Sequence, residues 1–154
     1  MEPTPRELFK ALKFIYATLT AGVAILIVAF VIVKLSEESA ITDKNTIQYF
    51  WTISMLLTLS VIPATYYLFK KKISGISEEQ TFIQKLIVYR SAFILKMAML
   101  EACGFINIIF YQLTGNMYIL YAAIIALIIM IINYPNKSTI SSELKLTPEE
   151  NELL

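Results

Sequence analysis

Long apolar stretches alternate with short polar segments along most of this chain. Four stretches are long enough to cross a membrane, because a helix of about 20 mostly apolar residues spans a bilayer core. They lie at about 14–33, 49–69, 93–113 and 117–134. Since hydrocarbon offers the backbone no hydrogen-bond partners, each stretch is expected to be a helix. The pattern predicts an all-α protein: an integral membrane four-helix bundle within residues 1–134, followed by a polar cytoplasmic tail at 135–154.

Lysine and arginine gather on alternate sides of the predicted spans. They precede the first span, separate the second from the third and recur in the tail, whereas the third connection has none. Because such charges favour the cytoplasmic side, both termini and the second connection are expected in the cytoplasm (N-in, C-in). The charges are Arg6, Lys10 and Lys13; Lys70, Lys71, Lys72, Lys85 and Arg90; and Lys137 and Lys145.

A helical pattern extends upstream of the third apolar stretch. Between Phe82 and Ile87 apolar residues recur at helical spacing, and Ser77 with Gln80 matches a capping box. One helix of about 35 residues would be about 52 Å long, so the third helix is expected to extend into the cytoplasm. Its first turns either pack on the chain's own helices or form a docking surface for a partner. The frequency of interfacial helices favours the first interpretation.

Two similar tetrapeptides predict helix starts near the ends of the chain. "TPRE" (4–7) and "TPEE" (147–150) each place Thr as N-cap, Pro at the first helical position and Glu two residues later. Residues 135–145 are polar and lack aromatic side chains, so this segment is expected to be extended or loosely held.

Composition supports the membrane class and excludes much chemistry. The chain is 57% hydrophobic and only 16% charged, against about 25% charged residues in soluble domains. It has no histidine, one cysteine (Cys103) and four scattered glycines. General-base catalysis by histidine, a disulfide framework and a phosphate-cradling loop are therefore excluded. We predict no enzyme activity, catalytic residue, cofactor or metal site, and the net charge of +1 predicts no nucleic-acid partner.

Glu101 is an acidic residue inside the third stretch. It lies about 12 Å along the span, where an acidic side chain costs about 2.5–3.5 kcal/mol. The carboxyl is neutral, or paired inside the bundle with Thr58 as the preferred partner, or part of a hydrated path for protons or cations. Lys96 is about 140° away around the helix, so it is expected to reach the cytoplasmic headgroups instead. With Asn107, these residues form the candidate intramembrane polar site.

Small residues predict which helix faces touch. Ser91, Ala98 and Ala102 share a heptad-like spacing on the third stretch. Ala17, Ala21 and Ala24 do so on the first. Small side chains let membrane helices approach closely. Packing within the bundle is the favoured interpretation, and a subunit interface is the alternative.

The segment "MLEACGFINIIF" (99–110) resembles the ion-carrying outer helix of rotary ATPase membrane-ring subunits. The resemblance implies that Glu101 takes the place of the carboxylate that binds the translocated proton or sodium ion. The glycine-rich inner helix of that family is missing, because the first span has only Gly22. The overall layout is similar to uncharacterised small four-span inner-membrane proteins of bacteria.

Three function classes follow from these observations. A non-catalytic accessory or assembly subunit of a larger membrane complex agrees best with the small size and the absent catalytic residues. The alternative is oligomeric proton or cation translocation using Glu101. A lipid-modifying enzyme ranks last, because it needs a nucleophile with a base or clustered carboxylates. The expected partners are the lipid bilayer and a membrane protein or further copies of the chain. The expected location is the bacterial inner membrane.

Overall fold

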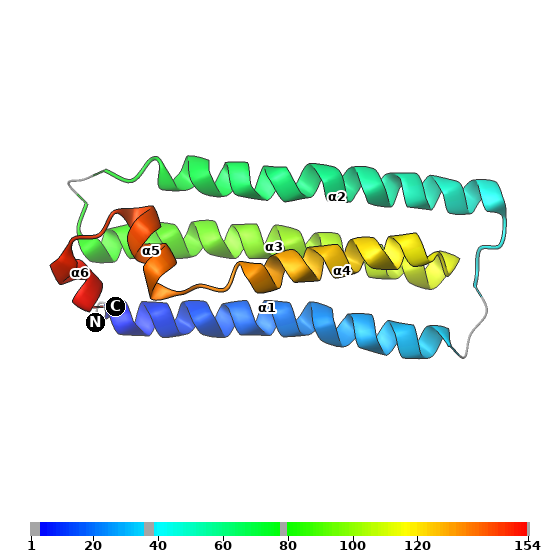
Figure 1. The fold of residues 1–154 in the computed structure, drawn as a ribbon, viewed down its shortest axis with the longest axis horizontal. Helices are drawn as coiled ribbons and strands as arrows, with labels where there is room; N and C mark the ends of the chain where they lie inside the picture. Colours follow the sequence, from blue (N-terminus) through cyan, green and yellow to red (C-terminus); the bar gives the residue numbers. More distant parts are fainter. Residues whose placement is uncertain (1–3, 36–38, 78–79, 154) are drawn as a thin grey trace.

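The computed structural model describes residues 4–35, 39–77 and 80–153 (Figure 1). These residues form six helices, and none of them lies in a strand. The all-α prediction is therefore confirmed. The helices are α1 (Pro5–Lys34), α2 (Lys44–Ile73), α3 (Phe82–Thr114), α4 (Met117–Ile132), α5 (Lys137–Leu144) and α6 (Pro148–Glu152).

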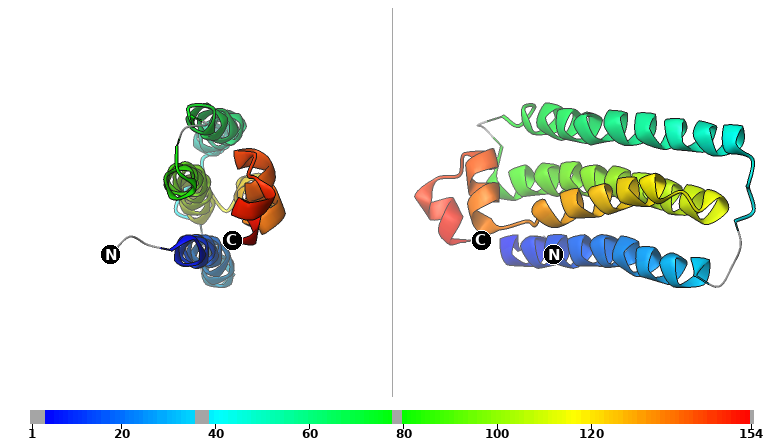
Figure 2. Two further views of the ribbon diagram at one scale, coloured as in Figure 1. Left: turned by 90° about the vertical axis from the view of Figure 1, so that its left-hand side faces the viewer. Right: turned by 45° about the vertical axis from the view of Figure 1, so that its right-hand side comes forward.

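Helix α3 is central to the arrangement. It contacts α1, α2 and α4, and α1 and α2 run along its opposite sides (Figure 1). Helix α4 lies against α3 and also contacts α1 and α2 (Figure 2). The first turns of α1 and the short helices α5 and α6 lie at the same end of the molecule (Figure 1). The side chains of α3 are consequently the most buried of the long helices.

Three helices are long and apolar enough to cross a membrane: α1, α2 and α3. In the most apolar part of α1, mean hydropathy is 2.5 and only 11% of the residues are buried within the protein. Such a surface is stable in lipid and costly in water. The prediction of several membrane helices is confirmed, and the chain is a multi-pass membrane protein.

The fourth predicted span is shorter than the sequence suggests. Helix α4 has 16 residues, which gives a length of about 24 Å against a hydrocarbon core of about 30 Å. Asn133 caps its end, and the chain passes Pro135 into α5, which is bent by 80° from α4. Proline cannot continue the hydrogen-bond ladder, so an uninterrupted helix through residue 134 was an overestimate. A fourth span exists only if α4 and α5 together count as one.

The helix starts agree with the predicted caps at both ends of the chain. Thr4 with Glu7 and Thr147 with Glu150 form complete capping boxes. The predicted cap of α3 was wrong, since Thr81 caps this helix and Gln84 reaches back to it. Thr81 directly precedes the run of apolar residues at helical spacing. It therefore serves as the N-cap in place of Ser77, which lies four residues upstream. Residues 78–79 of the predicted box lie outside the described residues.

Helix α3 is one continuous helix of 33 residues, as the pattern predicted. Its first turns pack on the chain itself, with Leu86 and Tyr89 buried. The interpretation as a helix that packs on its own protein is therefore confirmed. The prediction of an extended segment at 135–145 was wrong, because α5 forms there and buries Ile140 and Leu144. Ile140 and Leu144 are four residues apart and therefore lie on one face of α5, so their burial stabilises the packing of this short helix on the rest of the protein.

Packing within the bundle, the favoured interpretation of the small residues, was wrong, whereas the subunit interface stays a prediction. Ser91, Ala98 and Ala102 are exposed on α3, and Ala17 and Ala21 are exposed on α1. Ala24 is half-buried. The close approach of α1 and α3 occurs instead at Gly104, where an added Cβ would lie 3.1 Å from Cγ1 of Val23. Spacing alone shows that small residues share a face, but not which neighbour that face meets.

Candidate functional site

A buried polar cluster joins α2 to α3 in the middle of the apolar region. Asn107 of α3 is fully buried, and its Oδ1 accepts a hydrogen bond from the Ser54 hydroxyl of α2 at 2.5 Å. Its Nδ2 donates to Oγ1 of Thr58 at 3.1 Å and to Sγ of Cys103 at 3.6 Å. The Thr58 hydroxyl also donates to the Ser54 carbonyl at 2.8 Å. Each of these buried groups therefore has a partner, which makes the cluster a clamp between the two helices.

Lys96 occupies a second cluster, closer to the end where α5 lies. The side chain is buried, and its Nζ donates to Oδ1 of Asn133 at the end of α4. The ammonium group also lies over two aromatic rings of α2, 4.2 Å from the ring centre of Tyr66 and 4.7 Å from that of Phe69. Asn133 in turn donates to the Tyr66 hydroxyl at 2.8 Å. The expectation that Lys96 reaches the headgroups was wrong, because the protein itself provides its polar and aromatic partners.

A small cavity of about 90 Å³ lies beside this second cluster. Tyr89, Lys96, Asn133 and Glu143 are among the residues that line it. The Tyr89 side chain of α3 and the Glu143 side chain of α5 thus meet at the same cavity. The cavity is large enough for a few water molecules and too small for an organic substrate. We therefore interpret this cavity as a gap left by the packing of α2, α3, α4 and α5.

Glu101 lies apart from both clusters. It is half-buried on the flank of α3 that faces α1, where its Oε1 lies 3.7 Å from the position of a Cβ added to Gly22. Thr58, its predicted partner, belongs to the clamp around Asn107 on the α2 side. The side chain of Glu101 is therefore directed away from the polar residues that the sequence offered as partners.

The four predicted polar residues thus fall in three places. Asn107 and Thr58 are brought together, Lys96 belongs to the second cluster, and Glu101 stands beside Gly22. Sequence reasoning missed Asn133, which was taken only as part of the end of the fourth span. The available signal was an amide side chain two residues before Pro135, at a helix end where unpaired backbone carbonyls need hydrogen-bond partners.

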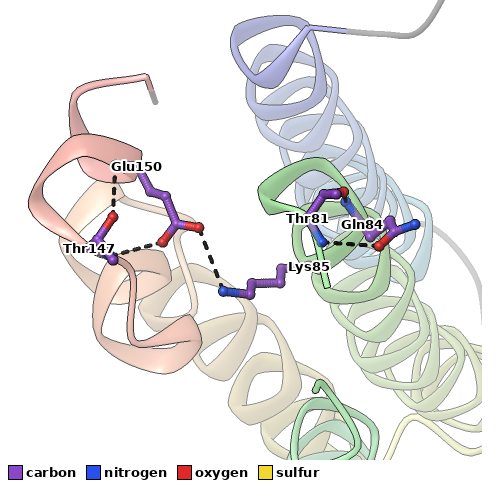
Figure 3. Close-up of polar contacts among 5 residues, drawn as sticks. All are labelled: Thr81, Gln84, Lys85, Thr147 and Glu150. Atoms are coloured by element: carbon purple, nitrogen blue, oxygen red, sulfur yellow. Dashed lines mark hydrogen bonds and ion pairs between the residues drawn. The ribbon is translucent and has the colours of Figure 1, made fainter. Parts of the chain in front are cut away.

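A third set of contacts attaches the tail to the start of α3 (Figure 3). Lys85 of α3 forms an ion pair with Glu150 of α6 at 3.6 Å. The same carboxylate closes the capping box of α6, because its other oxygen accepts the Thr147 amide at 2.9 Å. Together with the buried Ile140 and Leu144, these contacts hold the tail across the end of the long helices.

Within the described ranges 4–35, 39–77 and 80–153, no three His, Cys, Asp or Glu side chains lie close enough to hold a metal ion. Cys103 is buried and shares its hydrogen bonds with Thr58 and Asn107. Comparison of the chain with protein-family models, with curated proteins and with solved structures gives no match.

Proposed function

We propose that this chain is a non-catalytic subunit that helps to build a larger complex in the inner membrane of a bacterium. In this proposal α1, α2, α3 and the shorter α4 form a membrane bundle, and both termini face the cytoplasm, where lysine and arginine are concentrated. The observation that carries the proposal is an exposed face of α3 that has the composition of a helix-packing surface.

This α3 face consists of six exposed residues that recur every three or four positions, opposite the buried side of the helix. They are Ser91, Leu95, Ala98, Ala102, Ile106 and Ile109. Small residues favour close contact between membrane helices, because the backbones can approach and gain dispersion contacts. Since the chain's own helices leave this face uncovered, a helix of another protein or of a second copy is expected to cover it.

Glu101 strengthens this argument. Its carboxyl is only half-buried, on the flank of α3 towards α1, about 100° around the helix from Ala102 of the α3 face. A carboxyl near the lipid costs about 2.5–3.5 kcal/mol at the middle of a bilayer. A partner helix on the α3 face would remove Glu101 from lipid and give its carboxyl hydrogen-bond donors. Both features are then explained by one contact.

The test is purification of the tagged full chain from native membranes in a mild detergent, followed by mass spectrometry. The wild-type chain is expected to retain one membrane protein, or a second copy of itself, at a fixed ratio. Ala102→Leu is expected to release it, because the larger side chain separates the two helices. Ser60→Leu is the matched control, since Ser60 is an exposed small residue of α2. A wild-type chain that is monomeric and alone in every detergent would contradict the proposal.

A second candidate function is proton or cation translocation by an oligomer, with Glu101 as the carrier. Its support is the location of the carboxyl beside Gly22, where no side chain of α1 separates it from the backbone. Several copies would be needed to enclose a path. Glu101→Gln keeps the shape of the side chain and removes its charge. Ion flux into proteoliposomes should be lost in this variant, and unchanged flux would exclude the carboxyl as carrier.

A further inference from the structure

A groove of about 750 Å³ opens between the end of α2, the start of α3 and the tail. Its volume is in the range of ligand sites, which is about 300–1,000 Å³. Phe69, Ile73, Ile76 and Leu144 give it an apolar floor. The groove begins where the apolar part of α2 ends and its lysines follow, which is the depth of lipid headgroups. A ligand with both an apolar and a polar part fits this position.

The charged groups of the groove are mostly positive. Lys70, Lys85 and Lys145 line it together with one acidic residue, Glu143. Lys85 is paired with Glu150 of α6 (Figure 3). Among the described residues, the structure records no ion pair for Lys70 or Lys145. One lysine of α2 and one at the end of α5 are thus available to an anion.

Lys145 has an unusual backbone conformation for a lysine. It caps the end of α5 with φ 50° and ψ 49°, a left-handed conformation that glycine or asparagine adopts more readily. For other residues this conformation costs about 1–2 kcal/mol. The helix end alone would be served better by glycine or asparagine.

We propose that the groove binds the headgroup and upper acyl chains of an anionic phospholipid. The phosphate lies between Lys70 and Lys145, and the glycerol and first methylene groups lie on the apolar floor. Because the groove is formed partly by the tail, the bound lipid also holds α5 and α6 against the long helices. Charge selects anionic over zwitterionic lipid, and the floor selects a lipid over free phosphate.

The experiment is native mass spectrometry of the full chain in detergent, titrated with phosphatidylglycerol or with phosphatidylcholine of the same acyl chains. The wild-type chain is expected to bind phosphatidylglycerol more tightly. In Lys70→Gln/Lys145→Asn this affinity should fall about 25-fold, because each lysine near a membrane surface contributes about fivefold. Asparagine is chosen at position 145 because it tolerates the left-handed conformation, so the variant keeps the helix end.

The matched control is Lys72→Gln/Lys137→Gln. It removes the same charge from two exposed lysines that do not line the groove, so phosphatidylglycerol affinity should change by less than about twofold. An equal loss in both double variants would overturn the proposal in favour of diffuse attraction. Equal binding of the two lipids would also overturn it. Thermal unfolding of the wild type is also measured with inorganic phosphate and with glycerol 3-phosphate. If either stabilises the protein as much as phosphatidylglycerol does, the groove binds a free phosphate compound and the lipid proposal is overturned.

Discussion

The clamp between α2 and α3 allows a quantitative test of the fold. Replacing Ser54 and Asn107 by alanine, singly and together, measures the free energy of their interaction as a double-mutant cycle. The Ser54 hydroxyl donates to Asn107 at 2.5 Å in a fully buried setting. Interhelical hydrogen bonds in membrane proteins contribute about 0.6 kcal/mol on average and up to about 1.7 kcal/mol. The short distance and complete burial place this pair in the upper half of that range.

Asn107→Ala should cost more than Ser54→Ala. Asn107 makes two hydrogen bonds to α2, to Ser54 and to Thr58, so its replacement removes about 1.2 kcal/mol of hydrogen bonding before any cavity cost. Thr58 keeps its bond to the Ser54 carbonyl in every variant of the cycle. The coupling energy therefore reports mainly the bond between the Ser54 and Asn107 side chains.

The assay is reversible unfolding in dodecylmaltoside micelles with increasing fractions of sodium dodecyl sulfate, followed by circular dichroism and Trp51 fluorescence. Ser60→Ala is the control, because this exposed hydroxyl bonds only its own helix, at the Leu57 carbonyl. It should change the free energy of unfolding by less than about 0.5 kcal/mol. A Ser54–Asn107 coupling energy below about 0.2 kcal/mol would refute the clamp.

Three further predictions concern the helix ends. Asn133→Leu should lower the free energy of unfolding by about 1.5–3 kcal/mol in the same assay, because the Lys96 ammonium stays buried and loses its hydrogen-bond acceptor; unchanged stability would contradict this role. Gly115→Ala should lower the free energy of unfolding by about 1–2 kcal/mol, since Gly115 ends α3 with φ 65°, which alanine adopts at a cost. An unfolding midpoint equal to that of the wild type would contradict this prediction. The amide of Thr46 holds the pKa of Asp43 below its ordinary value, so its capping contribution is present at neutral pH and is lost as pH falls through the folded-state pKa. Asp43→Asn should reduce this acid sensitivity of the start of α2, measured by amide hydrogen exchange, and an unaltered pH profile would contradict the assignment.

The long helices were predictable because apolar length and capping chemistry are local properties. The extent of α1 and α3 followed from runs of apolar residues and from Thr4 with Glu7. The tail was not predictable in this way. Ile140 and Leu144 lie in a polar segment of 11 residues, and their burial depends on a surface that the other helices create. The same holds for the end of α4, where Pro135 was visible but the 80° bend was not.

The polar residues, too, were predictable only in part from the sequence. Asn107 was recognisable from the sequence as a polar residue inside an apolar span, and the structure shows that it is fully buried. Its partner could not be deduced, since Ser54 and Thr58 were two of five serine and threonine residues on the second stretch. The rotation of α2 and α3 about their axes decides which of these residues meet. That rotation depends on packing between helices and leaves no pattern in a single sequence.

The central claim is that the α3 face of the chain is covered by a protein in the membrane. The most direct measurement places a photo-cross-linking amino acid at position 102 and, in a second variant, at position 60 of the full chain, and irradiates native membranes. The account predicts one defined protein adduct, with a partner subunit or a second copy of the chain, from position 102 and only lipid adducts from position 60. Lipid adducts alone from both positions would contradict it.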